Sequence, residues 1–167
     1  MSAHTVRFTY EVADHLIAAR LYYSVSRLRK IDRVIAWILI AFGGWQTVRF
    51  GIYWATIIWW FFAVLLWQGR ALVQTIMIRM LFARNPRYRN PYEMTFDGTG
   101  VYITAPSIDA QIAWTYYTLA VENTRVIILI WGWNAYTVVP KRAFSDTRSL
   151  DAFRSFAQIK IARWVSR

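Results

Sequence analysis

The chain has 167 residues, of which 57% are hydrophobic, and it contains ten each of Trp, Tyr and Phe. This composition excludes a disordered chain, because disorder requires low hydrophobicity and few aromatic residues. The formal net charge is +11, and the chain has no cysteine, which excludes a disulfide scaffold, an iron–sulfur site and a thiol nucleophile.

The N-terminal residues predict a strand followed by a helix. Residues 4–10 (HTVRFTY) alternate between polar and apolar side chains, so residues 1–11 are expected to hold a strand. This strand either joins the C-terminal sheet or stands apart from it. Residues 12–33 predict an amphipathic helix, with apolar and polar faces at helical spacing, that leads into the first of two apolar segments.

Residues 34–48 and 50–69 carry no charged side chain and predict a transmembrane hairpin. The second segment has 20 residues, so it rises about 30 Å as a helix, whereas the first rises about 22 Å and needs its flanking residues to cross a bilayer. Arg49–Gly51 is the expected turn, with Gly51 ending the first helix in a left-handed conformation. A buried hairpin in a soluble protein is the alternative, but Trp59–Phe62 put aromatic rings on every face of one helical turn.

Four residues within the spans are candidate intramembrane contacts. Gly43 and Gly44 permit close approach of a second helix, or simply kink the first span. Trp59 and Trp60 lie too deep for the interfacial region in which tryptophan is enriched. We therefore expect these two side chains to contact lipid tails or another protein.

The basic residues predict how the hairpin crosses the membrane. They cluster before the first span and after the second, where residues 70–91 hold five arginines and no acidic residue. The positive-inside rule then places both termini in the cytoplasm. Residues 70–91 are expected to form a basic juxtamembrane helix and linker, in which Arg70 and Arg79 either contact anionic headgroups or are ordinary flanking charges.

From residue 92 the hydrophobic pattern changes from helical to alternating, which predicts a strand-rich domain over residues 92–167. The turn Asp97–Gly100 calls for a positive φ at Gly98 or Gly100. Six strands are expected, at residues 92–96, 101–105, 108–114, 116–121, 126–130 and 135–139, followed by a helix from about residue 147 to residue 163.

The expected terminal helix has one apolar face, formed by Leu150, Phe153, Ala157, Ile161 and Trp164. Trp114 is expected to pack under it. The predicted fold class is therefore an α+β membrane protein, in which a two-helix transmembrane hairpin carries a small cytoplasmic β-barrel or sandwich capped by a C-terminal helix. With the N-terminal strand included, this element order is similar to that of pleckstrin-homology-like barrels, an analogy that implies no ligand.

Several short segments resemble the YcxB-like family of bacterial membrane proteins. They are Phe96–Gly100, Ile112–Trp114, Glu122 and, most specifically, Val139–Phe144 (VPKRAF). The family pattern has an N-terminal strand and helix, two membrane spans and a compact C-terminal domain, and it matches this chain along its length. The resemblance implies a two-span protein of the bacterial inner membrane, and it implies no particular activity.

The VPKRAF segment has a structural interpretation and a functional one. Pro140 is expected to stop the last strand and Phe144 to anchor the helix connection. Alternatively, Arg125, Lys141 and Arg142 form a site for an anion or a partner that faces the membrane. Neither nucleic-acid binding nor a basic surface stripe is indicated, because residues 92–167 hold eight basic and six acidic residues.

The sequence predicts no catalytic residue, cofactor or metal site. His4 and His15 fit no metal-ligand spacing, and neither a phosphate-binding glycine loop nor a nucleophile elbow is present. The leading hypothesis is a non-enzymatic, membrane-anchored interaction module, an accessory, assembly or scaffold subunit that binds membrane lipids and either a membrane-protein partner or a second copy. The first alternative is an anionic-lipid-responsive protein that uses the juxtamembrane helix with Lys141 and Arg142. The second is a membrane enzyme, which would need His15, Asp14 or Glu122 together in a polar pocket.

Overall fold

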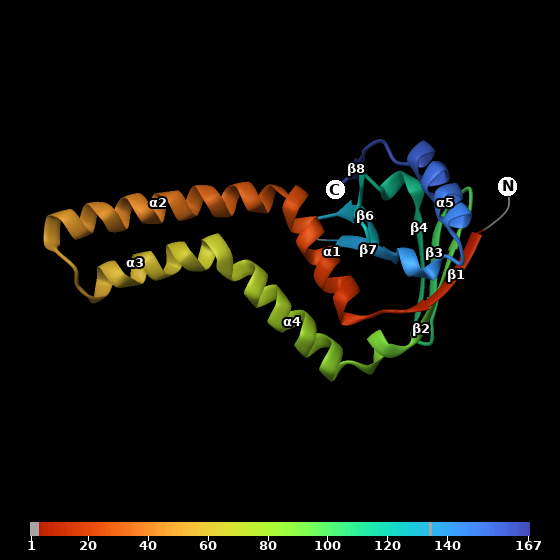
Figure 1. The fold of residues 1–167 in the computed structure, drawn as a ribbon, viewed down its shortest axis with the longest axis horizontal. Helices are drawn as coiled ribbons and strands as arrows, with labels where there is room; N and C mark the ends of the chain where they lie inside the picture. The colour runs from red at the N-terminus through yellow and green to blue at the C-terminus, as the bar shows by residue number, and fades with distance from the viewer. Residues whose placement is uncertain (1–3, 134) are drawn as a thin grey trace. The chain divides into compact units, whose positions relative to one another are not determined.

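The computed structural model describes residues 4–133 and 135–167 (Figure 1). Over these residues the chain is an α+β protein with two four-stranded sheets and five α-helices, in agreement with the predicted α+β class. It divides into two compact units. The sheet unit comprises Met1–Leu21 and Ile78–Arg167, and the hairpin unit comprises Tyr22–Met77.

The first sheet has the order β1-β2-β3-β4 and is antiparallel throughout. The N-terminal strand β1 pairs with β2, with His4 opposite Phe96 and Thr9 opposite Pro91. Since these two strands are neighbours in the sheet, the hairpin unit is an insertion between them. The strands are β1 (His4–Thr9), β2 (Pro91–Phe96), β3 (Gly100–Ala105) and β4 (Ile108–Ala113).

The second sheet has the order β7-β6-β5-β8, with β8 parallel to β5. Its strands are β5 (Leu119–Glu122), β6 (Val126–Gly132), β7 (Ala135–Pro140) and β8 (Trp164–Ser166). A 3₁₀ turn, Trp114–Tyr116, separates β4 from β5. The strand expected at 108–114 therefore ends at Ala113, and the strand expected at 116–121 begins at Leu119. Another 3₁₀ turn, Lys141–Ala143, follows β7.

Both sheets contribute to one hydrophobic core with helix α5 (Thr147–Lys160). The ring of Phe153 on α5 lies 4.5 Å from that of Phe96 and 5.3 Å from that of Phe144, measured between centroids. Trp114 is buried, and its ring contacts Phe156 of α5, as expected.

The end of the terminal helix differs from the sequence prediction. The helix ends at Lys160 rather than near residue 163, and Trp164 lies in β8 instead of on the helix face. The backbone of Ala120 donates a hydrogen bond to the carbonyl of Arg163, and that of Arg167 donates to Glu122. The chain end thus satisfies the open edge of β5, a tertiary pairing that outweighs the helical pattern.

The prediction of a positive φ at Gly98 or Gly100 is wrong. Among the described glycines only Gly51 has a positive φ, of 79°. Gly100 is needed for a different reason: a Cβ there would lie 2.5 Å from the carbonyl oxygen of Ile112 on β4. Asp97 forms the turn, because its Oδ1 accepts hydrogen bonds from the backbone N–H groups of Thr99 and Gly100.

The expected helix over residues 12–33 is two helices, α1 (Val12–Val25) and α2 (Arg27–Phe50). They are separated at Ser26, whose backbone is extended with φ −73° and ψ 149°. The basic residues before the predicted first span therefore belong to α2 itself. With 24 residues, α2 rises about 36 Å and is long and apolar enough to cross a membrane.

The expected straight helix over residues 50–69 is also interrupted. Phe50 belongs to α2, and α3 (Trp54–Val64) is followed by a π-helical turn, Leu65–Gly69, and by α4 (Arg70–Arg84). The segments Trp54–Trp67 and Leu72–Arg84 meet at 62°, and only taken together are they long and apolar enough to cross a membrane. A 3₁₀ turn, Pro86–Arg89, leads to β2.

Candidate functional site

The two helices of the hairpin touch at the glycine that the sequence singles out. Gly43 is buried, and a Cβ there would lie 3.3 Å from Cβ of Trp59 and 3.6 Å from Nε1 of Trp60. Gly44 differs, because a Cβ at this position would meet nothing within 4 Å. The structure thus brings Gly43, Trp59 and Trp60 together and leaves Gly44 out of this contact.

The polar groups near the turn of the hairpin are bonded within it. The Tyr53 hydroxyl donates to Oε1 of Gln46 at 3.2 Å and so links the turn to α2. Thr56 is buried, and its Oγ1 accepts from the backbone N–H of Tyr53 and donates to the carbonyl of the same residue. Thr47 donates to the carbonyl of Gly43 at 2.7 Å. The hydroxyls of Tyr53, Thr56 and Thr47 therefore all donate to groups within the hairpin.

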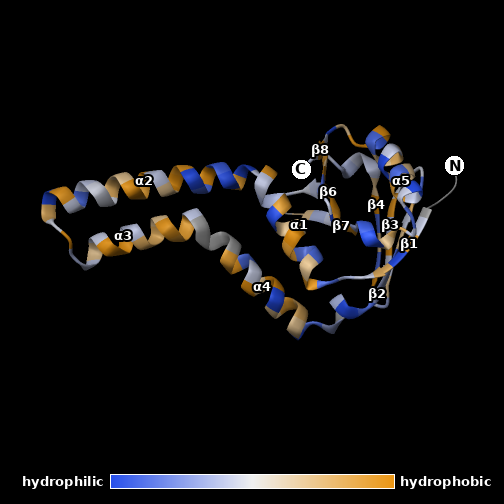
Figure 2. Ribbon diagram, viewed as in Figure 1, coloured by the Kyte–Doolittle hydropathy of each residue, from blue (hydrophilic) through white to orange (hydrophobic). Residues whose placement is uncertain are grey.

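Large apolar side chains cover the outside of the hairpin. Trp54 is 74% exposed, Phe61 61%, Trp45 57% and Trp60 42%. Hydrophobic residues recur along α2 and α3 in Figure 2. Other exposed large apolar residues of the two helices are Ile35, Trp37, Ile38, Val48, Ile57, Phe62 and Val64. A continuous apolar surface of this kind is typical of a face that lipid or another protein covers.

Lys141 belongs to a buried ionic cluster in the sheet unit. Its Nζ lies 2.5 Å from Oε1 of Glu122, which is only 5% exposed. Arg154 of α5 donates to both carboxylate oxygens of Glu122, and the indole of Trp164 donates to Oε2 at 3.2 Å. Burial favours the neutral acid, but the hydrogen bonds from Arg154 and Lys141 outweigh it and lower the pKa of Glu122. Arg154 also pairs with Asp151.

Arg142 joins a different network. Its Nη2 lies 2.5 Å from Oδ2 of Asp14 and donates to the carbonyl of Thr9, and its Nε lies 3.2 Å from Oε1 of Glu11. Lys141 and Arg142, although adjacent in the chain, therefore form ion pairs with different carboxylates. Arg142 links the turn after β7 to the start of α1.

Arg125 and Arg79 do not join these networks. Arg125 is exposed, and its carbonyl accepts from the backbone N–H of Lys141. Arg79 is exposed on α4, and the side chain of Arg70 lies outside the described part of the structure. The four whose side chains are described, Arg79, Arg125, Lys141 and Arg142, are therefore not gathered into one anion site.

The polar pocket that an enzyme would need from His15, Asp14 and Glu122 is not assembled. Asp14 pairs with Arg142, Glu122 belongs to the Lys141 cluster, and His15 lies among aromatic rings. Among the described residues, no group of three or more His, Asp or Glu side chains is placed to hold a metal ion.

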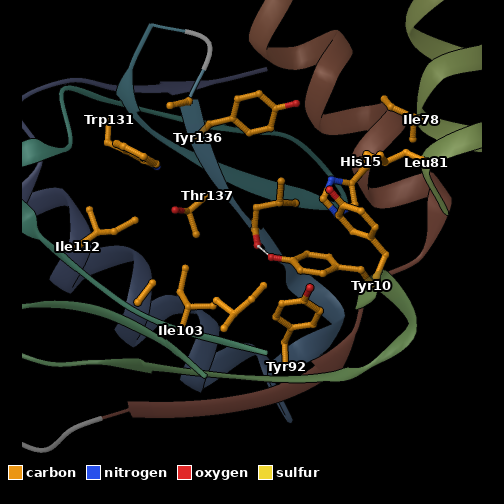
Figure 3. A pocket seen from close by; sticks show the side chains of 15 residues that line it. Tyr10, His15, Ile78, Leu81, Tyr92, Ile103, Ile112, Trp131, Tyr136 and Thr137 are labelled. Atoms are coloured by element: carbon orange, nitrogen blue, oxygen red, sulfur yellow. Dashed lines mark hydrogen bonds between the residues drawn. The ribbon is translucent and has the colours of Figure 1, made fainter. Parts of the chain in front are cut away.

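A cavity of about 520 Å³ that the sequence analysis did not predict lies within the sheet unit (Figure 3). Its wall comes mainly from the edge strands β4 and β7 of the two sheets, with single residues of β2, β3, β6 and α1 and two residues of α4. The lining residues are Tyr10, His15, Ile78, Leu81, Tyr88, Tyr92, Ile103, Ile108, Ala110, Ile112, Trp131, Ala135, Tyr136, Thr137 and Val138. No periodic pattern marks such a wall, because each segment contributes only a few residues.

Of the groups that line this cavity, His15 and Tyr10 have the pKa values that burial shifts most. The His15 ring centroid lies 4.6 Å from that of Tyr10, 5.1 Å from Phe82 and 5.6 Å from Tyr88. Burial lowers the pKa of His15 to about 4 and is the main cause of a raised pKa at Tyr10. The Tyr10 hydroxyl donates to the carbonyl of Val138 at 2.7 Å (Figure 3), whereas Nε2 of His15 is buried without a hydrogen-bond partner.

Comparison with known proteins supports the resemblance found in the sequence. Residues 96–157 match the model of the YcxB-like protein family, a range that runs from the end of β2 into α5. It includes Glu122, Lys141 and Arg154, so the ionic cluster lies within the family segment. Comparisons with curated proteins and with solved structures gave no match.

Proposed function

We propose that this protein is a non-enzymatic, membrane-anchored interaction module of the bacterial inner membrane. In this proposal α2 and the bent pair α3–α4 form a two-span hairpin, and the sheet unit is a pleckstrin-homology-like module on the cytoplasmic side. The hairpin binds a membrane-protein partner, so that the chain acts as an accessory or assembly subunit.

The apolar outer surface of the hairpin is the observation that carries this proposal. Trp60 packs against Gly43 on one side and still leaves 42% of its surface exposed, and Phe61 leaves 61% exposed. A two-helix hairpin is too thin to bury such side chains itself, and water is a poor environment for them. Lipid satisfies their hydrophobicity, and Gly44, at which an added Cβ would meet nothing within 4 Å, supplies a place for a helix of another protein to approach.

The topology is tested by labelling single cysteines, which is direct because the natural chain has none. Ile52 at the hairpin turn and Ile159 on α5 form a matched pair, being 80% and 82% exposed. A membrane-impermeant maleimide added to spheroplasts should label Ile52→Cys at once and Ile159→Cys only after permeabilisation. Equal labelling of both variants in intact spheroplasts would refute the two-span arrangement.

The partner is tested by photo-crosslinking from the hairpin in native membranes. A photo-reactive residue at Trp60, mid-way along α3, should give a protein adduct of one defined mass, while the same residue at Ile159 on α5 controls for adventitious capture. If exposed positions of the hairpin yield only lipid adducts and the protein purifies alone in gentle detergent, the interaction proposal fails.

The anionic-lipid alternative has less support from the geometry. Lys141 forms an ion pair with Glu122, and Arg142 forms ion pairs with Asp14 and Glu11. Both cations are therefore already paired inside the sheet unit. Arg79 stays available on α4 because it is exposed. We therefore treat headgroup attraction as a flanking contribution to anchoring.

A further inference from the structure

We propose that a pocket at the end of the hairpin opposite its turn binds the headgroup phosphate of an anionic phospholipid, and that Arg29 and Arg33 donate hydrogen bonds to it. The pocket has a volume of about 330 Å³ and lies wholly within the hairpin unit. The inference rests on the membrane hairpin proposed above and adds a defined lipid site to it. The lining residues are Tyr23, Ser24, Arg29, Arg33, Leu66 and Trp67.

The two arginines of this pocket are cations that the protein itself does not pair. Arg29 and Arg33 lie one turn apart on α2, so their positive charges repel each other. Neither forms a hydrogen bond or an ion pair with another described residue. Oδ2 of Asp32, which lies between them in the sequence, accepts a hydrogen bond from the Tyr23 hydroxyl at 2.9 Å. An anion bound by both guanidinium groups would therefore relieve a repulsion that remains in the protein alone.

Both guanidinium groups are within reach of a ligand, and their chemistry suits a phosphate. Arg33 is exposed and Arg29 is half-buried. A guanidinium group presents its N–H donors in a planar fork that matches the oxygen atoms of a phosphate. The described lining contains no Asp or Glu, so the ammonium group of a zwitterionic headgroup finds no carboxylate in it. The pocket should therefore bind phosphatidylglycerol in preference to phosphatidylethanolamine.

The apolar side of the pocket indicates that the phosphate belongs to a lipid. Leu66 and Trp67 line this side, and both come from the π-helical turn after α3. The ring centroid of Trp67 lies 5.8 Å from that of Trp37, which is 59% exposed and follows Arg33 by one turn of α2. An acyl chain can thus leave the charged side of the pocket along aromatic surface, whereas a soluble phosphate has no use for that surface.

The position of the pocket along the hairpin also fits a phospholipid. The uncharged residues 34–48 begin directly after Arg33, and the uncharged residues 50–69 end just after Trp67. Both segments therefore change from apolar to charged beside this pocket. In the proposed membrane arrangement this change marks the interface, where tryptophan is enriched and where basic residues attract anionic lipids.

The test is a lipid titration of the full chain in a neutral detergent, followed by native mass spectrometry, which counts bound lipids. Phosphatidylglycerol should bind about tenfold more tightly than phosphatidylethanolamine with the same acyl chains, because attraction to anionic lipid amounts to about fivefold per basic residue. Glycerol 3-phosphate carries the phosphate without acyl chains and should not displace the lipid at equal concentration. Equal binding of the two lipids, or displacement by glycerol 3-phosphate, overturns the proposal.

A matched pair of double variants separates the pocket from the general positive charge of α2. Arg29→Gln with Arg33→Gln removes both charges of the lining and should abolish the preference for phosphatidylglycerol. Arg27→Gln with Lys30→Gln removes two exposed charges outside the lining, and it should change the preference less than about twofold because water screens such charges. Equal losses in the two proteins overturn the proposal. Should the first variant not fold, Ser24→Phe decides, since it narrows the pocket without changing its charge and should also weaken binding of phosphatidylglycerol; unchanged binding overturns the proposal.

Failure of this inference and failure of the proposed function give different results. Labelling of Ile52→Cys in spheroplasts reports on the crossing of the membrane and involves no residue of the pocket. If Ile52→Cys reacts as expected while phosphatidylglycerol shows no preference, the lipid site is refuted and the two-span hairpin stands. Equal labelling of Ile52→Cys and Ile159→Cys refutes the two-span arrangement instead, and with it the membrane interface on which this inference rests.

Discussion

Replacing Glu122 with glutamine should destabilise the sheet unit more than any single change on its surface. The carboxylate lies at the junction of four segments, because β5 carries it while Lys141, Arg154 and Trp164 approach from the turn after β7, from α5 and from β8. Glutamine has nearly the same shape but no negative charge. The two cations would then remain beside a neutral group in a largely buried site.

The magnitude follows from the burial of the three charged groups. Removing one partner of a buried ion pair typically costs about 3–5 kcal/mol. The side chain of Glu122 is 7% exposed, but those of Lys141 and Arg154 are 17% and 30% exposed. Water therefore restores part of the hydration of the cations, and we expect a loss of about 2–3 kcal/mol, near the value of hydrogen bonds to charged groups.

The pH dependence has a definite sign. The pKa of Glu122 in the folded protein is lower than its ordinary 4.5, because the hydrogen bonds from Arg154 and Lys141 outweigh the opposing effect of burial. The unfolded chain consequently takes up a proton more readily than the folded protein. The stabilisation is fully present above pH 4.5 and is lost as the pH falls below that value, and Glu122→Gln should lack this part of the acid sensitivity.

Urea unfolding of the full chain in nanodiscs, followed by near-ultraviolet circular dichroism, measures this difference. Glu93→Gln is the matched control, since Glu93 pairs with Arg7 on the surface, where the two side chains are 39% and 78% exposed. This control should cost less than about 1 kcal/mol. If Glu122→Gln unfolds at the same urea concentration as Glu93→Gln, the reasoning about the buried cluster is refuted.

Three further predictions use positions that the structure sets apart. Gly100→Ala should lower the melting temperature of the sheet unit strongly, because the new Cβ meets a β4 carbonyl at 2.5 Å, whereas Gly98→Ala, with nothing within 4 Å, should leave it unchanged; equal effects would contradict this. Gly43→Leu should weaken the packing of α2 on α3 and make the hairpin more sensitive to proteolysis in micelles, while Gly44→Leu should keep the natural resistance unless a partner helix packs there. Stability should also fall as the pH drops from about 6.5 to about 4, because the unfolded chain protonates His15 in a window where the folded protein keeps it neutral; at about 1.4 kcal/mol per pKa unit the loss is at most about 3.5 kcal/mol, and a His15→Phe protein should show a flatter urea-midpoint profile over this range.

Hydrophobic alternation and turn residues predicted much of the secondary structure, because these patterns depend on interactions between residues that are close in the sequence. The alternation of residues 4–10 reflects strand β1, and the N-cap of α5 is local too, since Asp146 accepts from the backbone N–H of Ser149 at 2.6 Å. Trp114 lies against α5, as its place at a strand end indicated. The strand alternation and the N-cap depend on contacts within one element or its immediate turn, whereas the packing of Trp114 on Phe156 joins two distant segments.

The candidate site was harder to predict, because long-range pairing determines it. Lys141 and Arg142 are adjacent and equally basic in the sequence, yet one pairs with Glu122 and the other with Asp14, which lies 128 positions earlier. Trp164 fits a helical stripe, but the unpaired edge of β5 draws it into β8. Periodicity contains no information on which distant carboxylate or strand edge will be nearby.

Because the hairpin is inserted between β1 and β2, the sheet unit folds from segments that lie on both sides of the hairpin in the sequence. Val6 and Phe8 of β1 are buried in the core of the sheet unit, although they precede the hairpin, so a C-terminal fragment that begins after α4 lacks part of its own core. The entropic cost of closing a chain loop grows only slowly with its length, and a hairpin of packed helices shortens the effective loop further. A cut in the hairpin turn would leave two pieces that β1 and β2 still hold together by their six-residue register. The fold therefore joins the sheet unit to the hairpin at both of its ends, which suits the membrane-anchored module proposed above, since such a module would have to withstand pulling by a partner.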